Sequence, residues 1–313
     1  METKTFNLLG NFSYSRLEKY LSCPYAYKLS YVDGNFVSAN SLAIHVGTLL
    51  HKVNEYICLS IINNKKIDYD KILDFIDNAG VTDVSLDMFS EKKDSGIKGV
   101  NILKREFFEE WFSTNTKSSK SMKQKIDEFK ERIHDLENEF KNSDWEPYKV
   151  EDPFEFKFNG VTFKGFIDRI DKHKVTGALR VIDYKTKDAK FNEKELTTPL
   201  QFVVYAMAIM NKYGQTPESF IYDLPLIGEK QEGGTKGFIA RGEKKMSSIL
   251  ESIEKEDYKP TPSPLCYWCN FCCNNSNAVA PYNKMCKYYS LWTPTNKTFE
   301  VNCKYGSLFI LKP

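Results

Sequence analysis

Residues that alternate between apolar and polar are concentrated in the middle of the chain. Residues 149–158 and 161–170 both alternate, and Asn159-Gly160 between them is typical of a two-residue hairpin turn. A third run, Leu179–Thr186, is rich in β-branched side chains. We therefore predict a meander of three antiparallel strands over these residues.

Helical periodicity comes before this predicted sheet. A short helix over residues 15–21 has Ser13 as a suitable N-cap and ends before Cys23-Pro24. Longer helices are predicted where apolar residues recur at spacings of three and four, in residues 44–62, 67–80, 100–112 and 123–140.

A further helix is predicted after the meander, over residues 195–214. Pro199 lies in its first turn, and Gly214 ends it. The remaining predicted elements are a strand at Ser219–Leu224, a hairpin or loop in the glycine- and charge-rich residues 229–242, and a surface helix over residues 243–256.

The third predicted strand carries two opposite charges. Asp183 and Lys185 lie two residues apart, so both point to one face of the strand. If the preceding strand pairs with it, Asp168 can join them, and two carboxylates beside a lysine suit a divalent cation and phosphodiester hydrolysis. The alternative is a cross-strand ion pair on a solvated sheet face.

Composition restricts the class of protein. The 313 residues carry a formal net charge of +2, so any surface that binds nucleic acid must be local. We find no apolar run of about 18 residues and no signal-peptide pattern at the N-terminus, and we expect a cytoplasmic protein with no membrane contact. In that compartment the eight cysteines are expected to be thiols or metal ligands.

Cysteines gather near the C-terminus. Cys266 and Cys269 form a C-x-x-C motif, which is a strong signal for a metal site in such a protein. Zinc typically requires two separate pairs, and here Cys269 and Cys272 overlap the first pair. Four thiolates can instead hold a [4Fe–4S] cluster, which we expect here. Zinc is the alternative.

Five segments together resemble one known family. Asp168 with Asp183-x-Lys185 resembles the signature of the PD-(D/E)XK nuclease superfamily, in its RecB-like and phage-type exonuclease branch. Four further segments match motifs of that branch in order: the serine- and arginine-containing helix before Cys23-Pro24, Gly47 to His51, Gln201 to Tyr205, and Cys266 to Cys286. Ile167 stands where the signature has proline.

The resemblance implies an α/β (α+β) fold. Its restriction-endonuclease-like core has the order αβββαβ, with the His51 helix first and the fourth strand parallel to the third. We expect one nuclease domain over 1–313, made of an N-terminal segment (1–62), a helical insertion (63–145), a catalytic core (146–258) and a cysteine-rich tail (259–313).

The resemblance also implies the roles of the site residues. His51, Asp168, Asp183 and the carbonyl of Tyr184 would hold Mg²⁺ or Mn²⁺. Lys185 would stabilise developing charge or position water, and Gln201 and Tyr205 would orient substrate or Lys185. The family's cluster would be a structural [4Fe–4S] group on Cys23, Cys266, Cys269 and Cys286, with Cys272 or Cys273 as alternatives to Cys286.

The implied function is a metal-dependent DNA exonuclease in recombination, repair or phage replication. Its partners would be DNA ends and a helicase or recombination protein, in a bacterial cell or a phage-infected host. Two alternatives are a catalytically silent DNA-binding accessory protein and a zinc-stapled interaction module. For the 63–145 region we favour a packed helical subdomain over one whose lysines contact DNA phosphates, namely Lys117, Lys120, Lys123 and Lys125.

Overall fold

The computed structural model describes two compact units, one of residues 1–39, 157–163 and 244–313 and the other of residues 40–156 and 164–243. The residues it describes are 5–6, 8, 10–36, 42–78, 122–261, 263, 266, 269–272, 282, 285–286, 288–293, 298–303 and 308–311. The predicted helix over 100–112, Lys117, Lys120 and Cys273 lie outside these ranges.

A five-stranded sheet confirms the predicted meander. The strands lie in the order β1-β2-β3-β4-β5, in which β2 and β3 are antiparallel and β3 and β4 are parallel, as the restriction-endonuclease-like core requires. Their bounds are β1 Trp145–Phe158, β2 Val161–His173, β3 Leu179–Tyr184, β4 Ser219–Leu224 and β5 Glu229–Glu232.

The turn between β1 and β2 has the predicted chemistry. Asn159 and Gly160 have φ values of +49° and +83°, as a type I′ turn requires at both central residues. The twist of this turn matches the twist of the strands beside it. The hairpin therefore fixes the register that brings β1 alongside β2.

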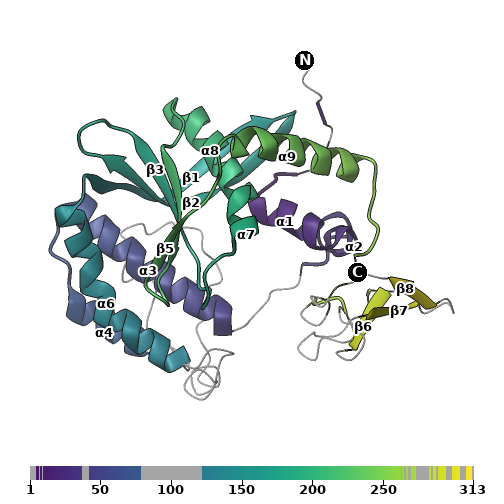
Figure 1. Cartoon of the computed structure of the whole chain (residues 1–313), viewed down its shortest axis with the longest axis horizontal. Coiled ribbons are helices and arrows are strands. Elements are labelled where there is room, and N and C mark those ends of the chain that lie inside the picture. The colour runs from purple at the N-terminus through teal and green to yellow at the C-terminus, as the bar shows by residue number, and fades with distance from the viewer. Residues whose placement is uncertain are drawn as a thin grey trace. The chain divides into compact units, whose positions relative to one another are not determined.

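Three helices share one apolar core in the second unit: α3 (Leu42–Ile62), α4 (Tyr69–Asn78) and α6 (Met122–Asn142). Figure 1 shows them together on one side of the sheet. Each buries one face at helical spacing, which confirms the predicted helices over residues 44–62, 67–80 and 123–140. The buried side chains include Leu50, Val53, Ile57, Ile72, Phe75, Ile126, Phe129 and Ile133.

Helix α8 (Leu200–Tyr213) lies on the other side of the sheet (Figure 1). Gly214, with φ of +71°, is its left-handed C-cap, as predicted, whereas Pro199 is its N-cap and does not lie in its first turn. Phe202 stacks on Tyr222 of β4 with 4.2 Å between ring centroids. The single helix predicted over residues 195–214 is in fact two, because a separate short helix, α7 (Glu193–Thr197), precedes α8 and begins with a capping box.

The first unit contains the N-terminal helices. Ser13 caps α1 (Tyr14–Ser22) by accepting from the backbone N–H of Arg16 at 3.2 Å, as predicted. The chain continues through α2 (Pro24–Tyr27) and the π-helical turn η1 (Lys28–Val32). A three-stranded antiparallel sheet in the tail was not predicted: β6 (Tyr288–Thr293), β7 (Thr298–Cys303) and β8 (Leu308–Leu311).

Helix α9 (Phe238–Glu254) differs from its prediction in two ways. It begins five residues before the predicted start at 243, and it is not only a surface helix. Its buried face carries Met246, Ile249, Leu250 and Ile253. Near its start, Gly242 lies so close to α8 that an added Cβ would be 2.2 Å from Cγ2 of Val203.

We predict that Gly242→Ala lowers the free energy of unfolding by about 1–3 kcal/mol, because the added methyl group overpacks this contact. Chemical denaturation measures the change. Combining it with Val203→Ala should recover part of the loss, since the second change removes the atoms that clash. If the double variant loses as much free energy of unfolding as the two single variants lose together, the contact between Gly242 and Val203 does not limit packing.

Candidate metal centre and active site

Tyr184, the last residue of β3, presents both of its peptide groups to the candidate site. Its N–H donates to Asp168 Oδ2 at 2.9 Å, and its carbonyl oxygen accepts from His51 Nε2 at 3.3 Å. Because a carbonyl oxygen can only accept, Nε2 of His51 carries a proton in this arrangement. In a neutral ring the lone pair is then on Nδ1.

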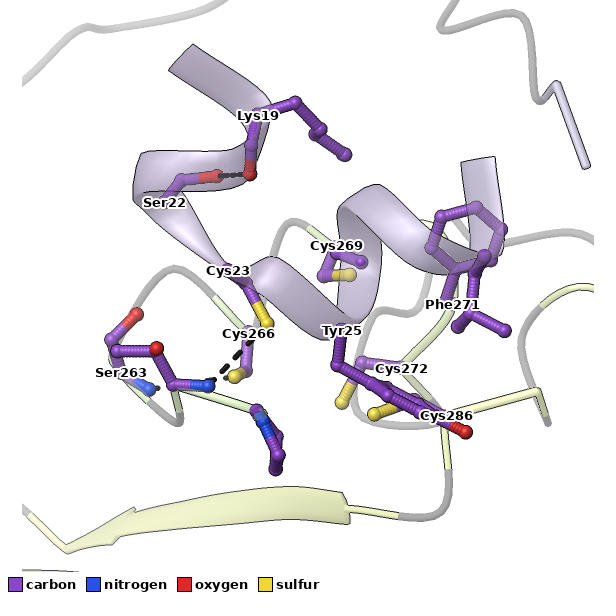
Figure 2. A pocket seen from close by; sticks show the side chains of 14 residues that line it. Lys19, Ser22, Cys23, Tyr25, Ser263, Cys266, Cys269, Phe271, Cys272 and Cys286 are labelled. Atoms are coloured by element: carbon purple, nitrogen blue, oxygen red, sulfur yellow. Dashed lines mark hydrogen bonds between the residues drawn. The ribbon is translucent and has the colours of Figure 1, made fainter. Parts of the chain in front are cut away.

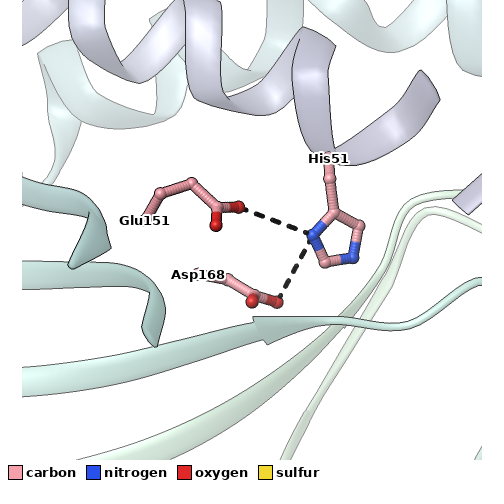
Figure 3. Close-up of side chains that lie close together, drawn as sticks. All are labelled: His51, Glu151 and Asp168. Carbon is pink, nitrogen blue, oxygen red and sulfur yellow. Dashed lines mark ion pairs between the residues drawn. The ribbon is translucent and has the colours of Figure 1, made fainter. Parts of the chain in front are cut away.

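His51 Nδ1 faces two carboxylates (Figure 3). Asp168 Oδ2 lies 3.7 Å away and Glu151 Oε1 lies 3.9 Å away. One ligand atom from each of the three residues lies within 4.8 Å of the other two. A neutral imidazole nitrogen and two carboxylate oxygens are ligands that divalent cations accept, so these residues fit such an ion.

Asp183 is held from three directions. Its Oδ1 accepts from Gln201 Nε2 at 2.7 Å and from the Tyr205 hydroxyl at 3.2 Å, while Lys185 Nζ lies 2.6 Å from Oδ2. Gln201 Nε2 also donates to the Tyr205 hydroxyl at 2.9 Å. Burial raises the pKa of Tyr205 well above its usual range, and the charge of Asp183 adds to this, so the hydroxyl remains a donor.

Two site residues among the crowded carboxylates, Asp168 and His51, have raised pKa values. Burial raises the pKa of Asp168 to about 7, and the charge of Asp183 acts in the same direction. Burial alone would lower the pKa of His51, but the nearby carboxylates of Glu151, Asp168 and Asp183 outweigh it and raise that pKa. A bound cation would take over the role of these protons.

Glu151 is a site residue that sequence reasoning missed. It lies within β1 but has φ of +44°, whereas the following residues alternate between buried and exposed. Such a break is typical of a β-bulge, which redirects a side chain. The available signal was the adjacent pair Glu151-Asp152 inside an alternating strand. Asp152 instead binds Lys212 Nζ at 2.8 Å and the Tyr213 hydroxyl at 2.9 Å.

The structure brings every predicted catalytic and metal-binding residue into the second unit. His51, Asp168 and Tyr184 lie together, with Nδ1 of the His51 ring toward Asp168 and Nε2 toward the Tyr184 carbonyl. Asp183, Lys185, Gln201 and Tyr205 form a second, contiguous group. The two groups meet at Tyr184, which follows Asp183 in β3 and binds Asp168.

Comparison with known proteins identifies the family. The model of the PD-(D/E)XK nuclease superfamily matches residues 11–273. The chain belongs to this superfamily. An ATP-dependent helicase/deoxyribonuclease subunit from Clostridium tetani is 29% identical over 248 residues, which cover 71% of this chain and 20% of that protein. The chain thus spans about a fifth of the length of this curated relative.

One solved structure that is similar to this chain is that of a protein proposed to be an exonuclease, from Eubacterium rectale. The two are 12% identical, with a TM-score of 0.42 over 86% of this chain and 88% of that one. Within the described ranges, no helix is both long and apolar enough to cross a membrane.

Of the four lysines considered for DNA contact, Lys123 and Lys125 lie within the described residues, and both have carboxylate partners. Lys125 is only 3% exposed in its side chain and lies 3.0 Å from Asp188. Lys123 lies 2.5 Å from Asp127 on α6. Lys125 is therefore buried against the loop that follows β3, which favours the packed-subdomain interpretation of α6.

The predicted cluster cysteines lie in the first unit of the superfamily member. A cavity of about 190 Å³ is lined by Cys23, Cys266, Cys269, Cys272 and Cys286 (Figure 2). Backbone N–H groups of Thr261 and Ser263 donate to Cys23 Sγ and Cys266 Sγ, each at 3.5 Å. Cys58, in the second unit, is fully buried, and burial raises its pKa to about 11.

The pKa of Asp168 predicts how stability depends on pH without metal. Its folded pKa of about 7 exceeds the ordinary 3.8, so the folded state binds this proton more tightly than the unfolded state. The resulting stability is present below pH 4 and is lost as pH rises to about 7. Asp168→Asn should remove this loss and raise the free energy of unfolding at pH 8, relative to wild type, by about 2–4 kcal/mol.

Urea denaturation in EDTA at pH 5 and pH 8 measures this effect. Asp188→Asn is the control, because a hydrogen bond from Lys125 lowers the pKa of Asp188 below its ordinary 3.8, so the stability that this carboxylate contributes is already complete at pH 5. That variant should therefore differ from wild type by the same amount at pH 5 and at pH 8. An equal response of wild type and Asp168→Asn to pH would contradict the raised pKa of Asp168.

Proposed function

We propose that this protein is a metal-dependent DNA nuclease that acts as an exonuclease. The observation that carries the proposal is the arrangement around Tyr184, whose peptide groups bind Asp168 and His51 beside the Asp183–Lys185 pair. Membership of a nuclease superfamily supports phosphodiester hydrolysis. The word deoxyribonuclease in the name of the Clostridium tetani relative supports DNA as substrate.

His51, Asp168, Asp183 and the Tyr184 carbonyl, with Glu151 added by the structure, would hold Mg²⁺ or Mn²⁺. The ion supplies Lewis-acid polarisation of the phosphate and a lower pKa for a bound water. The protein's own part is to orient the oxygen ligands. Tyr184 N–H orients Asp168, and His51 directs Nδ1 toward the carboxylates because Nε2 is bound to the carbonyl.

Lys185 and the Gln201–Tyr205 pair act on the other group. Lys185 would stabilise the charge that develops on the phosphate or position the attacking water, since its ammonium group already lies beside Asp183. Gln201 and Tyr205 fix Asp183 Oδ1, which leaves Oδ2 toward Lys185. They are positioning residues for Asp183 and, through it, for Lys185.

We propose a structural [4Fe–4S] cluster for the cysteine cavity. The support for it is that five cysteines line one cavity, which offers more than the four thiolates that such a cluster needs. The proposed ligands are Cys23, Cys266, Cys269 and Cys286, with Cys272 as the alternative fourth ligand. A zinc ion on the same thiolates is the alternative.

Cellular context completes the proposal. The relative from Clostridium tetani is named as part of a helicase/deoxyribonuclease, which supports a helicase or recombination protein as partner in a bacterial or phage-infected cytoplasm. The single nuclease domain over 1–313 remains our prediction for its organisation. The alternative function is a DNA-binding accessory protein that has the same fold and does not cleave.

Cleavage of end-labelled linear DNA in Mg²⁺ or Mn²⁺ tests the enzyme. Asp183→Ala and Lys185→Ala should each reduce the rate by at least about 100-fold, because the first removes a proposed metal ligand and the second removes the cation beside the reacting phosphate. The matched controls are Asp77→Ala and Lys130→Ala, which remove an ion pair between α4 and α6 outside the site. These controls should cleave at the wild-type rate.

The same assay separates the two functions. Release of label without cutting of circular DNA identifies an exonuclease. A wild-type protein that binds DNA but cleaves no substrate in either metal would reject the nuclease and support the accessory protein.

Metal analysis of protein purified without oxygen tests the cluster. Wild type should contain about four iron atoms per chain. Cys23→Ser and Cys269→Ser should lose most of this iron and some thermal stability, because chelation contributes folding free energy. Cys58→Ser, at a buried thiol of the second unit, should retain it. Stoichiometric zinc in place of iron would reject the cluster.

A further inference from the structure

A buried group of charges lies against the ring of Tyr184, away from its peptide groups. Arg169 is fully buried, and its guanidinium donates from Nη1 to the Tyr184 hydroxyl at 2.7 Å. Asp171, also fully buried, lies 2.9 Å from Arg169 Nε and binds Arg180 at 2.8 Å. Phe140 of α6 covers the Arg169 guanidinium at 5.2 Å.

This arrangement leaves the Arg169 guanidinium little freedom. A planar guanidinium held by a buried carboxylate on one edge can direct its remaining N–H groups only within a narrow range. Burial raises the pKa of Tyr184 well above its usual range, although the charge of Arg169 opposes this, so the hydroxyl stays neutral and accepts the bond. The ring of Tyr184 is therefore anchored to a rigid point.

The hydrogen bond between Arg169 and the Tyr184 hydroxyl lies where the backbone pairing of β2 with β3 ends. The ladder between β2 and β3 runs from Lys172↔Leu179 to Arg169↔Ile182. Beyond that pair, Tyr184 N–H binds the side chain of Asp168 in place of a backbone carbonyl. The hydrogen bond from Arg169 to the Tyr184 hydroxyl also joins β2 to β3 at this end of the ladder, through side chains.

We propose that Arg169 and the Tyr184 hydroxyl are positioning residues of the candidate metal centre. The side chain and peptide groups of Tyr184 belong to one residue, so fixing the ring restricts the φ and ψ that direct its N–H to Asp168 and its carbonyl to His51. Arg169 thus acts on the metal ligands through the backbone of β3. The consequence for catalysis rests on the proposed function, but the positioning itself does not.

Amide hydrogen exchange of the full chain in EDTA tests the positioning by NMR. Tyr184→Phe keeps the ring and removes only the hydroxyl. The amide of residue 184 should then exchange about tenfold or more faster, because its bond to Asp168 is no longer held in place. The amides of Val181 and Ile182, which lie in the ladder, should change much less.

A purely structural role predicts a different pattern. General destabilisation would speed exchange at residues 181, 182 and 184 by the same factor, and that result would overturn the proposal. Tyr27→Phe is the matched control: Tyr27 is fully buried and its hydroxyl accepts from Arg16 Nε at 3.1 Å in the first unit. It should leave the relative exchange of the residue 184 amide unchanged.

A second variant tests the route through Arg169. Arg169→Lys keeps the charge beside Asp171 but loses the planar fork, so it should speed exchange at residue 184 as Tyr184→Phe does. The double variant should be no worse than either single one, because both remove the same bond. If the two substitutions speed exchange at residue 184 additively, Arg169 does not act through its bond to the Tyr184 hydroxyl.

DNA cleavage gives the catalytic consequence. Tyr184→Phe should reduce kcat at least about tenfold with KM for DNA within about twofold, since misplaced ligands affect the reaction more than binding. If wild type cleaves no DNA, the proposed function fails while the exchange measurement still decides the positioning role. Faster exchange at residue 184 with unchanged kcat would overturn the catalytic consequence alone.

Discussion

The site depends on how close several carboxylates can be held in a largely buried place. Asp168, Asp183 and Glu151 repel one another, and burial adds a desolvation cost that raises the pKa of Asp168 to about 7. The protein offsets this with a few directed contacts: the Tyr184 N–H on Asp168, His51 between two carboxylates, and Lys185 on Asp183. A divalent cation would complete the compensation and replace the protons.

The surrounding fold serves to hold these contacts. The hairpin at Asn159-Gly160 places β1 and Glu151 beside β2, and the parallel pairing of β3 with β4 fixes the end of β3. Helix α8 brings Gln201 and Tyr205 to Asp183, and α3 brings His51 to Asp168. The buried Arg169–Asp171 pair anchors the ring of Tyr184 behind the site.

Much of this could be predicted from the sequence because it follows from local rules. Alternation and the turn residues predicted the meander, and helical spacing predicted α3, α6 and α8. The spacing of Asp183 and Lys185 suggested their shared face, and the family resemblance supplied His51, Gln201 and Tyr205. Membership of the superfamily is confirmed, whereas the roles of these residues remain predictions.

The features that were missed depend on tertiary structure. Glu151 enters the site because its backbone takes a left-handed conformation, which residue type alone does not indicate. Helix α9 begins at Phe238, inside the glycine-rich stretch that predicted a hairpin or loop, and Gly242 within it packs closely on α8. Lys125, one of several similar lysines in the sequence, is distinguished only by its burial against Asp188.

Diffraction from crystals soaked in Mn²⁺, with the anomalous signal of manganese, is the most direct test of the central claim. We predict one or two manganese peaks bound by His51 and Asp168, with Glu151, Asp183 or the Tyr184 carbonyl completing the ligands. A wild-type crystal that shows no peak at these residues with millimolar Mn²⁺, or a peak only elsewhere, would contradict a metal centre organised by Tyr184.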